Sequence, residues 1–242
     1  MYTFESRVRY SETDASGKLS LGGIIDYFQD CTTFHSEDVG KGIVCLREQH
    51  KVWMLTSWQI IIDRYPAFGE KITIGTQPYD FKGMMGFRNF IIRNPQGVGM
   101  VKANSVWCLL DTVTGKPLRV TADDVACYGT GQRLEMDYAN RKIAIPEGGK
   151  LEAPFMVRPH QIDTNHHVNN GQYVKMAEEY LPAGFRVGQM RAEYKKQAML
   201  GDTMQPWVAE DAGRYVVVLY NEEKQPYAVV EFIQSRNGEG NQ

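Results

Sequence analysis

The segment "VRPHQIDTNHHVNNGQY", residues 157–173, determines how this sequence is interpreted, because an earlier segment repeats its layout. That earlier segment, "VRYSETDASGKLSLGGI" at residues 8–24, aligns with it without a gap at an offset of 149 residues (157 − 8). The two segments share identical residues at positions 8 and 157, 9 and 158, and 14 and 163. The order of these matches predicts an internal duplication, with one structural unit in each half of the chain.

Each segment leads into a sequence with helical periodicity. Apolar residues recur there near the 3.6-residue period of an α-helix. They are Leu21, Ile24, Ile25, Phe28 and Phe34 in the first half, and Tyr173, Met176, Ala177, Tyr180 and Leu181 in the second. We therefore expect one helix after each segment, the second beginning near Asn170 with Asn169 or Asn170 as its N-cap.

Strands are predicted downstream of the helices, where β-branched and aromatic residues are concentrated. The segments are 58–63, 70–77, 86–94 and 99–111 in the first half, and 213–220 and 226–234 in the second. Polar turn sequences occur at 94–97, 111–116 and 221–225. Each half is therefore predicted to be one helix followed by an antiparallel sheet.

A long helix packed on a curved antiparallel sheet is the hotdog arrangement, and the duplication predicts two of them in one chain. The expected fold class is α+β, with tandem hotdog domains at residues 1–125 and 153–242. Residues 126–152 are richer in glycine and polar side chains and are predicted to form a linker. The polar tail at 235–242 is expected to be frayed.

Composition is ordinary for a globular protein and gives no reason to expect a nucleic-acid partner, and no cofactor is expected. The chain has 242 residues, a hydrophobic content of 43% and a formal net charge of −2. No apolar run suits a signal peptide or a membrane span, so membrane insertion is not expected. The four cysteines form no CxxC pair, which favours free thiols in a cytoplasmic protein over a zinc site.

Three polar residues alternate at Asp163, Asn165 and His167. Side chains two residues apart share a face only on an extended segment, so this segment should be extended and should precede the helix N-terminus, which favours an oxyanion. His167 is then a candidate general base for water, and Asn165 a candidate to hold a carbonyl or that water. Asp163 would fix the loop and the imidazole tautomer. A tight turn stabilised by its own side chains would have the same spacing.

The first copy helps to separate these alternatives. It keeps the aspartate as Asp14 but has Ser16 and Lys18 where the second copy has the amide and the imidazole. The aspartate is therefore expected to shape both loops, with chemistry confined to the second half. His160 and His166 are expected at the surface rather than at a metal.

Several segments resemble the acyl-[acyl-carrier-protein] thioesterases of plant and bacterial fatty-acid synthesis. They are "WMLTSWQIIIDRYPAFGEKITIGT" (53–76), "NSVWCLLDTVTGKPLRV" (104–120) and "DTNHHVNNGQYVKMAEE" (163–179), and the resemblance extends roughly from Phe4 to Ile233. It implies hydrolysis of the thioester between a fatty acyl group and the phosphopantetheine arm of acyl carrier protein (ACP), which releases a free fatty acid and ends chain elongation. It also implies that Asp163, Asn165 and His167 are catalytic.

The sequence departs from the family where members often have an acidic residue followed by cysteine. Gln197 and Ala198 stand there, and the second half contains no cysteine. This favours attack by water without a covalent enzyme intermediate. Gln197 is a candidate to orient the water, although an amide cannot act as a general base. Glu193, four residues earlier, is an alternative.

By the same resemblance, the first half is expected to hold the acyl chain. The candidate contact residues are Phe28, Met54, Thr56 and Trp58, each of which would also fit an ordinary core. Carrier proteins are acidic, so a basic docking surface is expected, with Arg186, Arg191, Lys195 and Lys196 as candidates. Ordinary solvated charges would explain these four as well.

Two other functions stay open on the sequence. An acyl-coenzyme A thioesterase would cleave the same phosphopantetheine thioester. A non-catalytic module that binds acyl groups or the carrier would explain the changes at Gln197 and Ala198. A second copy of the chain is a candidate partner, and the residues do not predict an acyl chain length.

Overall fold

The computed structural model describes residues 1–235 and divides the chain into two compact units. Unit 1 comprises residues 1–56 and 63–138, and unit 2 comprises residues 57–62 and 139–242. The boundary after Tyr138 falls within the segment expected to be a linker. Most of the polar tail, residues 236–242, lies outside the described residues, whereas the Ser235 amide donates a 2.8 Å hydrogen bond to the Arg186 carbonyl.

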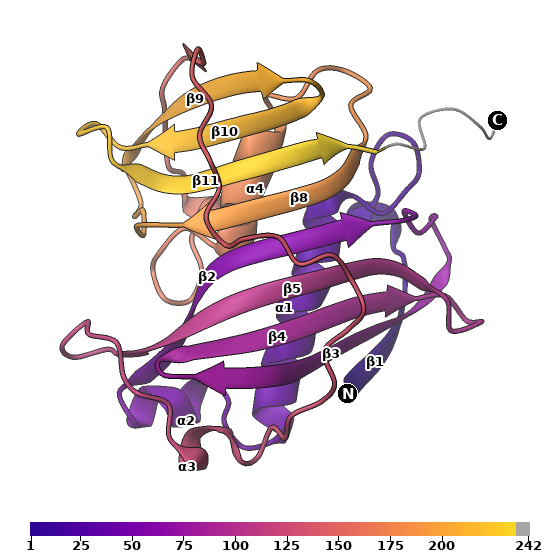
Figure 1. Cartoon of the computed structure of the whole chain (residues 1–242), viewed down its shortest axis with the longest axis vertical. Coiled ribbons are helices and arrows are strands. Elements are labelled where there is room, and N and C mark those ends of the chain that lie inside the picture. The colour runs from indigo at the N-terminus through magenta and orange to yellow at the C-terminus, as the bar shows by residue number, and fades with distance from the viewer. Residues whose placement is uncertain (236–242) are drawn as a thin grey trace. The chain divides into compact units, whose positions relative to one another are not determined.

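Unit 1 is one long helix on an antiparallel sheet (Figure 1). Its helical elements are η1 (Tyr10–Glu12), α1 (Leu21–Asp38), α2 (Ile43–Glu48) and α3 (Ala122–Val125). Its strands are β1 (Tyr2–Arg7), the first part of β2 (Lys51–Ile62), β3 (Lys71–Lys82), β4 (Met85–Arg93) and β5 (Gly99–Asp111), in the order β1-β3-β4-β5-β2. Buried Phe28 on α1 packs against Phe90 on β4, with ring centroids 5.1 Å apart.

Unit 2 repeats this plan with a shorter helix. It contains β6 (Lys150–Leu151), β7 (Phe155–Met156), η2 (Pro159–Gln161), α4 (Asn170–Glu178), β8 (Val187–Tyr194), β9 (Thr203–Asp211), β10 (Arg214–Tyr220) and β11 (Pro226–Gln234). The end of β2 pairs with β8, and the order continues β8-β11-β10-β9-β6, with β7 also on β9. Each unit is thus an α+β hotdog-like unit, as the duplication predicts.

The predicted elements are mostly found, with three differences. The strands expected at 99–111 and 226–234 coincide with β5 and β11, and the turns at 94–97, 111–116 and 221–225 are present. Strand β1 precedes α1, and β6 and β7 precede α4, so the expected order of helix before sheet is wrong in both units. Strands β8 and β9 are not among the predicted strands. The expected long second helix is only nine residues, against eighteen in α1, because Pro182 follows its end.

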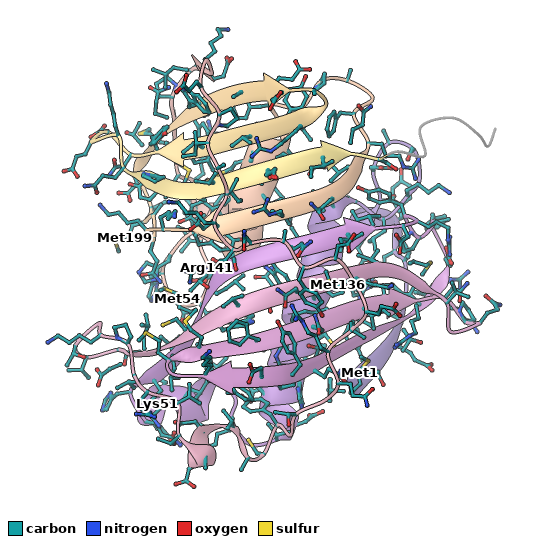
Figure 2. All side chains as sticks on the ribbon, in the orientation of Figure 1. Met1, Lys51, Met54, Met136, Arg141 and Met199 are labelled. Atoms are coloured by element: carbon teal, nitrogen blue, oxygen red, sulfur yellow. The ribbon has the colours of Figure 1, made fainter. Side chains whose placement is uncertain are left out.

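The segment from 131 to 144 follows a fixed path across the sheet faces, and we call it the strap. In Figure 1 it crosses the face of each sheet opposite to α1 or α4. In unit 1, the buried Asn89 side-chain oxygen accepts 3.0 Å hydrogen bonds from the Leu134 amide and the Tyr138 hydroxyl. Met136, labelled in Figure 2, lies beside the same asparagine, with its Sδ 3.9 Å from Nδ2. The expected linker is therefore held by the sheet of unit 1 along this part.

In unit 2 the strap is held by charged side chains as well as by apolar packing. Arg191 donates to the carbonyls of Asn140 and Lys142, and Glu193 accepts from the Ile143 amide. The Ile143 side chain is buried among Val216, Val218 and Val229. No helix within residues 1–235 has the length and apolar character needed to cross a membrane.

Candidate catalytic loop

The loop before α4 is shaped by one carboxylate. Asp163 Oδ1 accepts hydrogen bonds from the backbone amides of Asn165 (2.8 Å) and His167 (3.3 Å). The Asp163 amide donates 2.8 Å to the His167 carbonyl, which closes the loop on itself. The turn leaves His166 in the left-handed region, with φ 63°. Asp163 thus fixes the backbone on which Asn165 and His167 stand.

The loop before α1 has the same geometry. Asp14 Oδ1 accepts from the amides of Ser16 (2.9 Å) and Lys18 (3.1 Å), and the Asp14 amide donates 2.8 Å to the Lys18 carbonyl. Gly17, with φ 71°, occupies the position of His166. The hydrogen bonds agree with the expectation that the aspartate shapes both loops.

Both loops end in a side-chain cap. Asn169 is the N-cap of α4, and its Oδ1 accepts a 2.8 Å hydrogen bond from the Gly171 amide. In unit 1 the equivalent Ser20 caps α1 by accepting from Gly23. Of the two expected caps, Asn169 is therefore the correct one, and His167 stands three residues before the first residue of α4.

His167 has a buried polar atom with unused hydrogen-bonding capacity. Its Nδ1 atom is buried and has no hydrogen-bond partner among residues 1–235. An unpaired buried polar group costs roughly 1–3 kcal/mol, so an external partner would stabilise it. The expected contact between Asp163 and the imidazole is not found among the described residues, because the aspartate Oδ1 is directed to backbone amides instead.

The segment after β8 lies against the loop. The Ala198 carbonyl accepts a 2.9 Å hydrogen bond from the Val168 amide, which follows His167 in the chain. The Ala198 amide donates 2.8 Å to the hydroxyl of Tyr173, a buried residue of α4. Gln197 is exposed immediately before this anchored residue. The structure thus brings the segment that carries Gln197 to the loop of His167.

Tyr173 is the contact that sequence reasoning missed. Its position in the helical periodicity indicated a core residue, and it is buried, which raises the pKa of its hydroxyl. The duplication contained the missing signal. In unit 1 the offset of 149 places Ile24 at the position of Tyr173 (173 − 149). Pro66 takes the place of Ala198, because its carbonyl accepts a 2.8 Å hydrogen bond from the Leu19 amide just as the Ala198 carbonyl accepts one from Val168. Proline has no amide hydrogen, so unit 1 needs no hydroxyl there.

Glu193, the alternative to Gln197, lies on the face of β8 opposite to α4. The Tyr194 hydroxyl donates 2.9 Å to the Asn170 carbonyl, which places Tyr194 on the α4 face of β8. Neighbouring side chains of a strand point to opposite faces. Glu193 therefore faces the strap, where its Oε2 accepts 3.2 Å from the Ile143 amide and its Oε1 pairs with Lys195.

The remaining polar residues of the loop are exposed. Asn165 is exposed, and only its backbone amide takes part in the loop hydrogen bonds. His160 and His166 are exposed as well, as expected. Within residues 1–235 no three His, Cys, Asp or Glu side chains gather as a metal site would require.

The four candidate acyl-contact residues differ in their surroundings. Phe28 is fully buried against Phe90 in unit 1. Met54, labelled in Figure 2, and Thr56 are half-buried on β2, and the Thr56 hydroxyl donates 2.9 Å to the Val106 carbonyl. Trp58 belongs to unit 2, where it is buried opposite Ala192 on β8. Their part in acyl binding stays a prediction.

Among the candidate docking cations, Arg191 and Lys195 form ion pairs within the protein. Arg191 forms a bidentate pair with buried Glu231 at 2.9–3.0 Å, and Lys195 pairs with Glu193. Arg186 and Lys196 are exposed. Arg191 is therefore a structural residue of the sheet and the strap, because its guanidinium is already satisfied there.

Two family models match the chain, one in each half. Residues 1–128 match the acyl-ACP thioesterase N-terminal domain, and residues 146–239 match the acyl-ACP thioesterase C-terminal domain. The chloroplastic acyl-[acyl-carrier-protein] hydrolase FATB1 of Cuphea viscosissima is 22% identical over 224 residues, covering 84% of this chain. The match covers 53% of that relative, so the chain spans about half of its length.

Solved structures of this family have the same fold. An acyl-ACP thioesterase from Bacteroides thetaiotaomicron superposes with a TM-score of 0.87 at 21% identity, covering 96% of this chain and 97% of the other. The 12:0-ACP thioesterase from Umbellularia californica superposes with a TM-score of 0.86 at 15% identity, covering 97% and 98%. With both family domains matched and the tandem hotdog-like fold in place, this chain belongs to the acyl-ACP thioesterase family.

Proposed function

We propose that this chain hydrolyses the thioester of a fatty acyl-ACP, giving a free fatty acid and the carrier's free thiol. The observation that carries the proposal is the contrast between two loops of the same shape. Only the loop of unit 2 has an imidazole, His167, next to the N-terminus of a helix, and its buried Nδ1 has no hydrogen-bond partner among residues 1–235. Membership of the family supports the reaction class.

In the proposed reaction His167 acts as general base. It takes a proton from water while the water oxygen forms a bond to the thioester carbonyl carbon, giving a tetrahedral oxyanion. The carbon–sulfur bond then breaks, and the proton on His167 passes to the departing sulfur. Water supplies the hydroxyl of the fatty acid, so the sequence balances without a covalent enzyme intermediate. Unit 2 contains no cysteine, which agrees with that route.

Neighbouring groups are assigned supporting roles. The exposed amide of Asn165 would hold the carbonyl oxygen or the water, and the partial positive charge of the α4 N-terminus would stabilise the oxyanion. Gln197 would orient the water, since its position is fixed through the two hydrogen bonds of Ala198. Asp163 would act by holding the loop rather than by polarising the imidazole.

The acyl chain and the carrier complete the proposal. We assign the acyl chain to the interior of unit 1, with Phe28, Met54 and Thr56 as candidate contacts, and ACP to an exposed basic surface that includes Lys196. We also place the reaction in the cytoplasm, because Cys31, Cys45, Cys108 and Cys127 are all free thiols.

The deciding experiment measures thiol release from a panel of acyl-ACP substrates and matched acyl-coenzyme A substrates. The unaltered protein and the His167→Ala variant are compared side by side. Release from acyl-ACP that is lost in the variant is the expected result. Faster release from the coenzyme A thioesters would show that acyl-coenzyme A, and not acyl-ACP, is the substrate. No release from either class, with acyl-ACP still bound, would indicate a binding module.

A further inference from the structure

The interior of unit 1 contains a cation without an acidic partner. Arg88, on β4, is only 7% exposed. Its Nη1 donates to His35 Nδ1 at 3.0 Å and to the Thr76 hydroxyl at 3.2 Å, and its guanidinium carbon lies 5.4 Å from the Tyr128 ring centre. No Asp or Glu within residues 1–235 forms an ion pair with it.

The groups around Arg88 are neutral. Arginine can only donate, so His35 Nδ1 accepts and its Nε2 carries the proton. Burial and the Arg88 charge together lower the pKa of His35 to about 4, so the imidazole is uncharged at neutral pH. Burial likewise raises the pKa of the nearby Cys31 thiol to about 12, which keeps it protonated. The cluster therefore has one uncompensated positive charge.

Buried charges in proteins are normally paired, and the effective penalty for an unpaired ion is several kcal/mol. Two hydrogen bonds to neutral groups and one aromatic contact offset only part of that penalty. Nε and Nη2 of Arg88 make no hydrogen bond to another residue in the part of the chain that the structure describes. The N–H groups of these two atoms form the fork that binds a carboxylate in bidentate fashion.

Arg88 also lies at one end of a row of buried side chains in unit 1. Phe28, Cys31 and His35 lie on one side of α1, and the seven helical steps from Phe28 to His35 (35 − 28) span about 10 Å of helix. Phe28 contacts Phe90, which shares a strand face with Arg88 two residues away. An alkyl chain that ran along this row from Phe28 would end at the guanidinium.

We propose that Arg88 is an anion-binding site at the end of the acyl-binding interior of unit 1, and that its ligand is a carboxylate on an alkyl chain. The inference rests on the proposed function for the location of the acyl chain. The carboxylate could have two sources. It could be the distal end of an ω-carboxyacyl substrate, or the head group of a free fatty acid that enters carboxylate-first.

Binding, rather than turnover, tests the site. Calorimetry on the full chain compares dodecanoate with dodecanol, which tests the free acid. A second comparison uses the His167→Ala variant and the ACP thioester of dodecanedioic acid, with its free carboxylate at the far end, against dodecanoyl-ACP. A hydrogen-bonded charge pair of about 1.5–3 kcal/mol corresponds to a roughly 10- to 150-fold preference for the carboxylate in at least one pair. The pair that shows the preference identifies the source.

Variants locate the effect. Arg88→Met should abolish the preference, and Arg88→Lys should keep part of it because the charge remains without the fork. Arg119→Met, the same change at an exposed arginine of unit 1, should leave the preference unchanged. Equal affinities within both ligand pairs in proteins that retain Arg88 would overturn the proposal even if Arg88→Met does not fold, and so would a preference that survives in Arg88→Met. Thiol release is measured separately, so failure of this site would not count against hydrolysis.

Discussion

The two loops that precede α1 and α4 have the same backbone hydrogen bonds but carry different side chains. Each is closed by an aspartate that accepts from the amides two and four residues ahead, and each has a left-handed residue in the same place. Only the second has an imidazole and a side-chain amide. The comparison separates the residues that shape the loop from those that supply chemistry.

A second difference lies in the segment that is hydrogen-bonded to each loop, which contains Pro66 in unit 1 and Ala198 in unit 2. Unit 1 has Pro66 and Ile24 at the positions where unit 2 has Ala198 and Tyr173. The amide hydrogen and the hydroxyl that accepts it are therefore present together or absent together. This pairing indicates that the tyrosine serves the position of the 197–198 segment, beyond its contribution to the core.

The largest expected effect is at the imidazole. His167→Ala should lower kcat/KM for thioester hydrolysis at least hundredfold, from the roughly 10²–10⁴-fold contribution of a general acid or base. Lys18→Ala, at the same place in the first loop, should change it less than twofold. Thiol release measures both. A loss below tenfold in His167→Ala would count against the general-base role.

Tyr173→Phe should destabilise the protein by about 1–3 kcal/mol, because the buried Ala198 amide loses its acceptor. We expect kcat to fall while KM changes little, because the substitution displaces the segment that carries Gln197 and leaves the acyl-binding site unchanged. Urea unfolding and steady-state kinetics report the two effects.

A double-mutant cycle with Ala198→Pro sharpens this prediction. Proline removes the amide, as in unit 1, so Tyr173→Phe should cost little stability in that background. A full stability cost in both backgrounds would show that the hydroxyl acts through another contact.

Asp163→Ala and Asp14→Ala should each cost about 1–2 kcal/mol in unfolding free energy, because both carboxylates satisfy two backbone amides. The Asp163→Asn variant keeps the accepting oxygen and should retain most of the activity. Strong inactivation of a well-folded Asp163→Asn protein would instead indicate a role for the charge at the imidazole.

The interior of unit 1 should make the stability of the protein depend on pH through His35. His35 has a pKa of about 4 in the folded state, against 6.5 without the protein environment, because burial and Arg88 disfavour its charged form. The unfolded chain therefore binds the additional proton, and stability falls as the pH drops from 6.5 towards 4. Between pH 7 and pH 5.5 the loss should be about 1 kcal/mol. Chemical unfolding at several pH values gives the unfolding free energy as a function of pH, and this free energy should change less steeply with pH in His35→Gln than in the unaltered protein. Equal slopes would contradict the assignment.

The smallest expected effect is at the left-handed position. His166→Gly should stabilise the protein by a few tenths to about 1 kcal/mol, since glycine adopts φ 63° without strain. Gly17→His, where there is open space for a side chain, should destabilise it by a similar amount. Thermal unfolding measures both, and thiol release should stay within twofold of the unaltered protein.

The duplication explains how much of the fold could be predicted from sequence. Glycines, prolines and alternating β-branched residues located β5, β11 and their turns, because those signals are local. Strand β1 was missed because "YTFESR" is held by pairing with β3, some seventy residues later, and not by its own pattern. The end of α4 was also misjudged, since its apolar periodicity continues to Leu181 beyond the last helical residue, Glu178.

The site, too, could be predicted only as far as it depends on contacts between residues close in sequence. The roles of Asp163 and Asn169 follow from hydrogen bonds across two to four residues, which spacing can indicate. The contact between Tyr173 and Ala198, and the direction of Glu193 towards the strap, depend on how distant segments pack. Spacing alone could not distinguish Glu193 from Gln197 because the strand ends at Tyr194, between them.

The hydrogen bonds of Asp163 have a consequence for how the site assembles during folding. They join residues two and four apart, so closing this loop costs little chain entropy and can occur early. The bond from Val168 to Ala198 spans thirty residues (198 − 168) and needs the sheet. The shape of the loop is therefore a local property, whereas its placement beside Gln197 depends on contacts between distant segments. We therefore expect a peptide of residues 157–173 to form the turn around His167 but to lack the contact with the 197–198 segment.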